Sequence, residues 1–267
     1  MEKINGVSYA SITKFIGRTK NELFRFAGRS KPTAVIPSLV TTNLVFNVDA
    51  SDTDNYNSDS ITDSVGSVRG DLSNGAYVDT TAHGGMIYTD GANDEVRWAA
   101  RSPLLFNSGA DKTLQAWVKI ANSEVNYWVV ADMGPSRDRG HYVRILGGKV
   151  MFGGSRDGAN TYRWQITQDQ EISQNTPTLI TVVHRVEAPE VEFYINDTLV
   201  SQEGYPRYGG VYSSYNDSRA ANTTTGIYYN RALPYEGRMG QMLVYDKALS
   251  QAEITQNYNA TKARFGL

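Results

Sequence analysis

The chain has no cysteine and only three histidines among its 267 residues. Without cysteine there can be no disulfide framework, no thiolate metal site and no cysteine nucleophile, which excludes small disulfide-stapled scaffolds and zinc ribbons. His83, His141 and His184 lie far apart in the sequence, and their spacing is not typical of a zinc site. The net charge of −2 gives the whole molecule no strong attraction for nucleic acid or anionic membranes.

Long apolar runs are also missing. No run approaches the length of a membrane span, and the first residues are not followed by the continuous apolar stretch of a signal peptide. We therefore expect a soluble chain with no membrane partner, unless another route exports it. With 40% hydrophobic residues, the chain can bury one large core or two modest ones, which excludes disorder for most of its length.

The first 32 residues differ in charge from the rest. They contain seven basic and two acidic residues, a net charge of +5, which leaves −7 for the remainder. Segments 3–8, 14–19 and 25–30, spaced by 11 residues, share a basic residue, an apolar residue, a glycine and a hydroxyl residue. Each predicts a short strand bent at its glycine. Thirty residues of this kind cannot bury a core alone, so we expect them to become ordered against a partner.

We interpret residues 1–32 as an extended basic docking arm, with a frayed N-terminal tail as the alternative. A tail without a partner would have little use for so many apolar side chains. Apolar residues of the arm would bury against the partner, and basic residues would set the register against acidic groups. The expected docking residues are Ile4, Ile12, Lys14, Phe15, Arg18, Phe24, Arg25, Phe26 and Arg29. Residues 33–38 would form a linker, and 39–267 a globular body.

The body has the pattern of an antiparallel all-β domain, with short runs of Val, Ile, Tyr, Trp and Thr between clusters of Gly, Asn and Asp. Alternation in segment 113–120 puts the aliphatic residues on one face, and Trp117 on the other face needs cover from a second sheet or a loop. About eleven strands fit one two-sheet sandwich. The expected strands are Leu44–Val48, Gly85–Tyr88, Glu95–Trp98, Thr113–Ile120, Tyr127–Ala131, Tyr142–Leu146, Lys149–Phe152, Thr178–Arg185, Val191–Ile195, Gly226–Tyr229 and Gly240–Tyr245.

Local signals predict two turns and one helix. Gly147–Gly148 and Asn196–Asp197 each join two strand-like runs as a tight hairpin. Ser250 and Glu253 have the spacing of a capping box, which predicts the start of a C-terminal helix. Gly266 is expected to end that helix.

These landmarks resemble the concanavalin A-like, laminin-G-type jelly roll. The matching segments are Leu44–Ala50, Ile87–Val96, Ala116–Val118, Tyr194–Asp197 and, most specifically, Gly237–Ile254. The resemblance covers residues 39–267 and implies a two-sheet antiparallel jelly-roll sandwich. We therefore expect an all-β protein with an extended N-terminal arm and a short C-terminal helix.

A narrower resemblance concerns the two ends of the chain. Segment 254–267 and the Ile-Asn-Gly-Val-Ser repeat at 4–8 are similar to jelly-roll proteins in the virions of tailed bacteriophages. This resemblance implies a virion structural protein, assembled in the host cytoplasm and displayed on the particle surface as a decoration, fibre or tail-associated protein. The arm would anchor it to capsid or tail proteins, and we expect a homo-oligomer.

Carbohydrate binding is the first alternative. The body would then be an adhesin or a tail-fibre receptor-binding protein that recognises a host surface glycan. Tyrosines crowd one segment rich in Gly, Ser, Asn and Arg, a composition suited to adaptable contact surfaces. The same tyrosines could instead pack loop against sheet or subunit against subunit. The possible glycan-binding residues are Tyr205, Tyr208, Tyr212 and Tyr215.

A polysaccharide-cleaving enzyme is the second alternative. Retaining glycosidases with this fold place two carboxylates on one strand in a Glu-x-Asp-x-x-Glu arrangement. The nearest segment, Glu190–Glu192, lacks the third acid. We therefore expect no catalytic residues and no enzyme.

Carboxylates in two loops suggest bound calcium as the one possible cofactor. Calcium prefers hard oxygen ligands, and the laminin-G resemblance implies an ion at the rim of the sandwich. The first loop does not match the EF-hand spacing, and Asp is common in loops. The possible ligands are Asp49, Asp52 and Asp54 in one loop and Asp90 and Asp94 in the other.

Overall fold

The computed structural model describes residues 3–4, 7–8, 37–99, 102–104, 106, 110–122, 126–133, 139–155, 163–167, 172–187, 191–203, 222–226 and 236–267. The chain divides into two units, 1–36 and 37–267. This division falls inside the expected linker. In the first unit, β1 (Lys3–Ile4) pairs antiparallel with β2 (Val7–Ser8), as the first repeat predicts.

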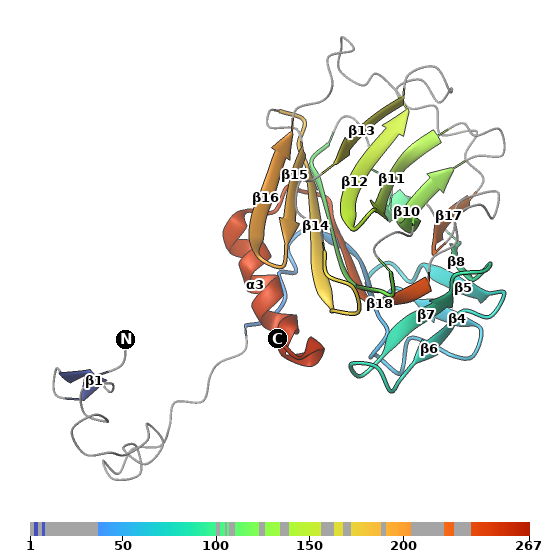
Figure 1. Cartoon of the computed structure of the whole chain (residues 1–267), viewed down its shortest axis with the longest axis horizontal. Helices are drawn as coiled ribbons and strands as arrows, with labels where there is room; N and C mark the ends of the chain where they lie inside the picture. Colours follow the sequence, from blue (N-terminus) through green and yellow to red (C-terminus); the bar gives the residue numbers. More distant parts are fainter. Residues whose placement is uncertain are drawn as a thin grey trace. The chain divides into compact units, whose positions relative to one another are not determined.

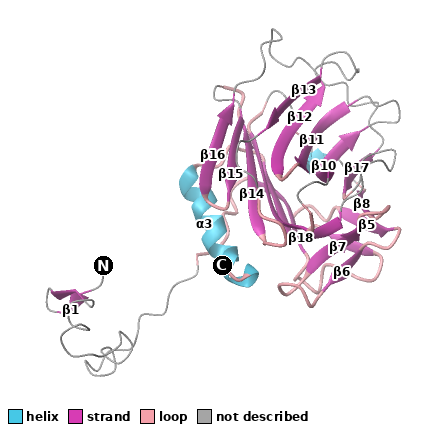
Figure 2. Cartoon of the chain, viewed as in Figure 1, coloured by secondary structure: helices cyan, strands magenta, loops and turns pink. Residues whose placement is uncertain are grey.

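The second unit contains two antiparallel sheets, which Figures 1 and 2 show facing each other. One sheet has the order β13-β12-β11-β10-β17-β8-β5-β4, and the other has the order β16-β15-β14-β9-β18-β7-β6 with β3 paired to β18. The strands are β3 (Leu44–Asp49), β4 (Ser60–Thr62), β5 (Arg69–Ser73), β6 (Tyr77–Asp79), β7 (Met86–Asp90), β8 (Glu95–Trp98), β9 (Lys112–Ile120), β10 (Asn126–Met133), β11 (Arg139–Leu146), β12 (Lys149–Ser155), β13 (Arg163–Thr167), β14 (Thr178–His184), β15 (Val191–Ile195), β16 (Thr198–Glu203), β17 (Asn222–Thr225) and β18 (Glu236–Tyr245). The expected all-β jelly-roll sandwich is confirmed.

Most expected strands are present, and both expected turns have the left-handed backbone that they require. Gly147 and Gly148 have φ of 58° and 71°, and Asn196 has φ of 59°. The expected start of a strand at Gly226 was wrong: β17 ends at Thr225, and Gly226 has φ of 94°. Residues 227–229 lie outside the described part of the chain.

Strands β4, β5 and β6 were not expected, because they are short and largely polar. A Cβ atom at Gly70 in β5 would lie 2.5 Å from the ring of Trp98. The neighbouring indole thus occupies the space that a larger side chain at position 70 would need, which explains a glycine within this strand.

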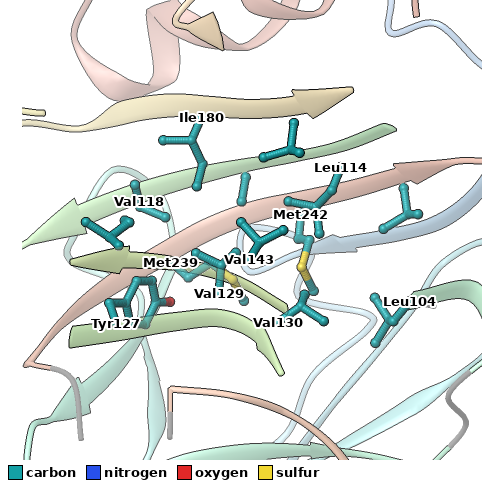
Figure 3. Packing of buried hydrophobic residues seen from close by; sticks show 14 of the residues in the cluster. Leu104, Leu114, Val118, Tyr127, Val129, Val130, Val143, Ile180, Met239 and Met242 are labelled. Atoms are coloured by element: carbon teal, nitrogen blue, oxygen red, sulfur yellow. The ribbon is translucent and has the colours of Figure 1, made fainter. Parts of the chain in front are cut away.

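The main core lies between the two sheets. Strand β9 contributes Leu114, Ala116, Val118 and Ile120, all at most 2% exposed. Figure 3 shows labelled side chains from β9, β14 and β18 meeting those from β10 and β11. Alternation along β9 therefore predicted the inner face correctly.

The outer face of β9, β14 and β18 is covered by the C-terminal helix. Helix α3 (Gln251–Thr261) is followed by the 3-10 turn η2 (Lys262–Phe265), and Gly266 ends it with φ of 83°. The Ser250–Glu253 capping box is present. Trp117 stacks on Phe265 with ring centroids 4.1 Å apart and donates to Thr261 Oγ1 at 2.9 Å. The expected cover for Trp117 is thus this helix, and not a sheet or loop.

A buried polar network lies under α3. Asn257 Nδ2 donates to Gln115 Oε1 at 2.6 Å and to the Tyr245 hydroxyl at 2.9 Å. Its Oδ1 accepts from the backbone N–H of Val40 at 2.8 Å, and the Tyr245 hydroxyl donates to the carbonyl of Val40. The network therefore connects the first residues of the body to the C-terminal helix. No described helix is long and apolar enough to cross a membrane.

Candidate functional site

The candidate site is a row of four side chains on the outer face of one sheet, beyond the part covered by α3. In the strand register, Tyr77 of β6 lies opposite Tyr88 of β7, and Tyr88 lies opposite Arg238 of β18. Arg238 in turn lies opposite Lys119 of β9. Residues directly opposite each other project to the same face, so all four belong to one row, here called the aromatic–cationic row. Tyr77 is 46% exposed, and the other three are partly exposed.

Aromatic and cationic contacts fix the middle of the row. The rings of Tyr77 and Tyr88 lie 5.3 Å apart and are tilted by 53°. The guanidinium of Arg238 lies 5.0 Å from the centroid of the Tyr88 ring, within the range of a cation–π contact. Burial, followed by the charge of Glu236, raises the pKa of Tyr88, so this hydroxyl stays protonated at neutral pH.

Asp79 holds Arg238 in place. Arg238 donates from Nε and Nη2 to Oδ2 of Asp79 at 3.1 and 3.0 Å. The other oxygen of Asp79 accepts from the hydroxyl of Thr81 at 2.6 Å and from its N–H at 3.0 Å. The Thr81 hydroxyl, followed by Arg238, keeps the pKa of Asp79 below its usual value. Arg238 is therefore positioned before any ligand arrives.

Further positive charge lies beside the row, around His83 in the β6–β7 loop. Arg264 in η2 donates to the carbonyls of His83 and Gly85 at 2.8 and 2.7 Å and pairs with Asp49. Burial first, and then the charges of Lys119, Arg264 and Arg238, lower the pKa of His83. Three cations, from β9, β18 and η2, thus disfavour the charged form of this histidine.

The opposite side of the row is acidic. Asp90 in β7 is directly opposite Glu236 in β18, and both are exposed. Asp94 lies behind them and is 2% exposed. Its Oδ2 accepts from the N–H of Asp90 at 2.9 Å, whereas its buried Oδ1 has no hydrogen-bond partner among the described residues. Burial, followed by the charge of Asp90, raises the pKa of Asp94.

We predict that Asp94→Asn stabilises the protein at neutral pH by on the order of 1 kcal/mol, because an amide removes a buried charge with an unpartnered oxygen. A carboxyl group whose pKa is raised on folding contributes stability at low pH, and this contribution is lost as the pH rises through the folded value. The gain of the variant should therefore disappear below about pH 4, near the usual pKa of Asp. Denaturant unfolding between about pH 3 and 8 measures this difference.

The exposed Asp54 provides the control. Asp54→Asn should leave the free energy of unfolding unchanged across the same range. An Asp94→Asn variant that is less stable than the parent at pH 7 would contradict the prediction. Repeating the measurement with added calcium tests the metal expectation, since only a chain with the Asp94 carboxylate should then gain stability.

The two loops of possible calcium ligands are not brought together. Asp49 is opposite Gln241 and Asp90 is opposite Glu236, which places them five residues apart along β18, roughly 16 Å. Asp49 accepts from Ser51 and pairs with Arg264. Carboxylates of Asp52 also accept hydrogen bonds within their own loop. Within the described ranges, no three His, Asp or Glu side chains form a group that could hold a metal.

This arrangement fits a cation poorly at the first loop, where carboxylate oxygens already accept hydrogen bonds or pair with an arginine. At the second loop, the free oxygen of Asp94 is a suitable ligand atom. Calcium at Asp90 and Asp94 therefore stays a prediction.

The other expected site residues fall largely outside the described part of the chain. This holds for Tyr205, Tyr208, Tyr212 and Tyr215, and for the arm from Ile12 to Arg29. Ile4 lies in β1, opposite Val7. The glycan-binding and docking roles of these residues stay predictions.

The acid that most resembled a catalytic carboxylate has a structural role. Glu192 is 6% exposed, and its carboxylate accepts from Arg185, Tyr194 and Gln202 at 3.1–3.2 Å. A carboxylate held by three donors inside the protein is not available to a sugar. Glu190 lies outside the described residues.

Sequence reasoning missed the aromatic–cationic row. Alternation along β7 places Met86, Tyr88 and Asp90 on one face, which was a usable signal. The row itself depends on the pairing of strands that are up to 161 residues apart, Tyr77 to Arg238. Strand order of this kind is not encoded in local spacing.

A family model described as the concanavalin A-like lectin/glucanases superfamily matches residues 74–255. No curated protein matches the sequence. Among solved structures, the binding domain of paraclostridial mosquitocidal protein 1 is similar, with a TM-score of 0.60 and 19% identity over 82% of this chain and 52% of that chain.

The receptor-binding domain of botulinum neurotoxin C/D mosaic serotype has a TM-score of 0.60 and 16% identity over 81% of this chain and 51% of that chain. A Trypanosoma rangeli sialidase in complex with 2,3-difluorosialic acid has a TM-score of 0.57 and 12% identity over 85% of this chain and 34% of that chain. The chain thus spans about half the length of the toxin domains and a third of the sialidase. At these low sequence identities, the similarities show a shared fold and nothing further. Because the family model matches more than half of the sequence, this chain belongs to the concanavalin A-like lectin/glucanase superfamily.

Proposed function

We propose that the body is a non-catalytic glycan-binding domain and that the aromatic–cationic row is its binding surface. The observation that carries the proposal is the contact of the exposed Tyr77 with the partly exposed Tyr88, beside an arginine held in place by Asp79. A sugar ring has an apolar C–H face that packs on an aromatic ring, and hydroxyl groups that accept hydrogen bonds from a guanidinium. The row offers both kinds of contact on one face.

The size of the row agrees with an oligosaccharide. Its four strands lie about 4.8 Å apart, so the row spans about 14 Å from Tyr77 to Lys119. A sheet face of this length suits a short extended saccharide. The superfamily to which the chain belongs is named after lectins and glucanases. The receptor-binding domains and the sialidase complex similar to this chain support a surface-recognition role through their fold.

We predict that Tyr77→Ala weakens oligosaccharide binding about tenfold, because the loss of one aromatic contact is worth about 1.4 kcal/mol. Glycan-array screening followed by titration calorimetry measures this loss. Leu199→Ala, at an exposed apolar residue of the opposite edge strand β16, is the matched control and should bind as the parent does. Unchanged binding by Tyr77→Ala would remove the row from the site.

A second role concerns attachment. We propose that the protein is a structural component of a tailed-phage virion, in which residues 1–32 dock on capsid or tail proteins and the body is displayed as an oligomer. Two observations support this role: the division of the chain at residues 36 and 37, and the net charge of +5 in the first 32 residues. The two roles are compatible, because a glycan-binding body on a virion would contact the host surface.

A further inference from the structure

Two carboxylates lie on the same sheet face as the aromatic–cationic row, beside its middle. Asp90 follows Tyr88 by two residues in β7, and Glu236 precedes Arg238 by two residues in β18. Residues two apart in a strand project to the same face and lie about 6.8 Å apart. Since Asp90 lies directly opposite Glu236, the two acids form a pair along one side of the row. A sugar ring packed on Tyr88 would therefore have this pair at its edge.

The pair keeps its negative charge exposed. Both residues are exposed, and neither forms an ion pair in the described part of the chain. Arg238, on the same strand as Glu236, donates to Asp79 instead, from two of its nitrogens. Like charges directly opposite each other destabilise a sheet. Folding alone thus gives no reason for the pair.

The surroundings of Tyr88 already disfavour a negative charge. Burial, followed by the charge of Glu236, raises the pKa of its hydroxyl, and Asp90 acts in the same direction while Arg238 opposes them. Lys119 lies two strands from Tyr88, about 9.6 Å, whereas Asp90 lies in the same strand. An anionic group of a ligand packed on this ring would meet the same two carboxylates.

We infer that Asp90 and Glu236 are specificity-determining residues, which restrict the row to neutral oligosaccharides and exclude sugars with an acidic group at Tyr88. This inference rests on the proposed glycan binding and names the class of glycan. Carboxylate oxygens accept hydrogen bonds from sugar hydroxyls, so the pair contributes to binding a neutral ring. An acidic group offers these oxygens no donor and is repelled by their charge.

Matched pairs of ligands test the inference by titration calorimetry on the full chain. They are short oligosaccharides of glucose, galactose and mannose, each compared with the same compound oxidised at C6 to the uronic acid. We expect at least one neutral compound to bind, about tenfold more tightly than its uronic counterpart. Added salt should narrow this ratio, because screening weakens the repulsion of the acidic compound.

A double variant tests the two carboxylates directly. Asp90→Asn with Glu236→Gln removes both charges and keeps an acceptor oxygen at each position. The affinity for the uronic compound should rise about tenfold, and that for the neutral compound should change less than about threefold. The variant should be at least as stable as the parent, because the like-charge pair is gone. The control, Asp54→Asn with Glu187→Gln, removes two exposed charges elsewhere and should keep the parent ratio.

Equal affinities of the parent for neutral and uronic compounds, or tighter binding of the uronic compound, would overturn the inference and leave the proposed glycan binding intact. A parent ratio in the variant without the two charges would also overturn it, because other groups would then exclude the acid. Binding of none of the compounds would overturn both proposals.

Discussion

Replacing Trp117 by alanine is expected to lower the free energy of unfolding by about 3–5 kcal/mol, the range for removing a large buried aromatic side chain. Trp117 is 1% exposed and is stacked between the sheet and the C-terminal segment. It contacts Phe265 and Tyr258 with centroids 4.1 and 6.0 Å away, and its indole N–H reaches Thr261. The variant thus loses its aromatic packing and one hydrogen bond. Denaturant unfolding followed by circular dichroism measures the loss.

Two variants separate the causes of that loss. Trp117→Phe keeps a ring against Phe265 and loses the indole N–H, so it should be destabilised by less than half as much as the alanine variant. Tyr77→Ala removes an exposed aromatic residue from the same sheet face and should unfold nearly as the parent does. An alanine variant at 117 with parent stability would mean that α3 and η2 add little to the fold.

Deleting residues 1–32 is expected to abolish incorporation of the protein into virions while leaving a folded body. The reason is that the deleted segment holds the +5 charge and the apolar repeats, whereas the body forms a unit of its own from residue 37. Particle purification with immunodetection measures incorporation, and thermal unfolding of the truncated chain measures folding.

A matched variant tests charge separately from length. Replacing Lys14, Arg18, Arg25 and Arg29 by glutamine keeps the arm and removes four charges. If charge sets the register, incorporation should fall sharply and should no longer depend on salt concentration. An unfolded product of the deletion would contradict the two-part description. Normal incorporation of the truncated body would contradict the docking role.

The sequence predicted the parts of the fold that local chemistry controls. Alternation along 113–120 identified the inner face of β9, and the Ser250–Glu253 spacing identified the start of α3. Each of these signals comes from residues that are only a few positions apart in the sequence. Strands β4 to β6 escaped because they are short and largely polar, and because Gly70 in β5 is explained by the indole of Trp98, 28 residues further along the chain.

The candidate site was less accessible to sequence reasoning than the fold. Tyr77, Tyr88, Arg238 and Lys119 come from four strands, and only the order β9-β18-β7-β6 puts them in one row. The tyrosines at 205–215 were predicted as glycan-binding residues instead, because they lie close together in the sequence. The acidic loops misled for a related reason: Asp49 and Asp90 lie opposite positions of β18 that are five residues apart, although both residues end strand-like segments with similar composition.

The bonds between Val40 and the pair Asn257 and Tyr245 determine how the body would respond to mechanical pulling. A tether that enters at residue 37 transmits tension to Val40 before it reaches β3. That tension is then shared by a helix and by β18, which pairs with β3, β7 and β9. The point of entry is thus reinforced by the opposite end of the polypeptide, so a body held only by its N-terminus resists being peeled apart strand by strand.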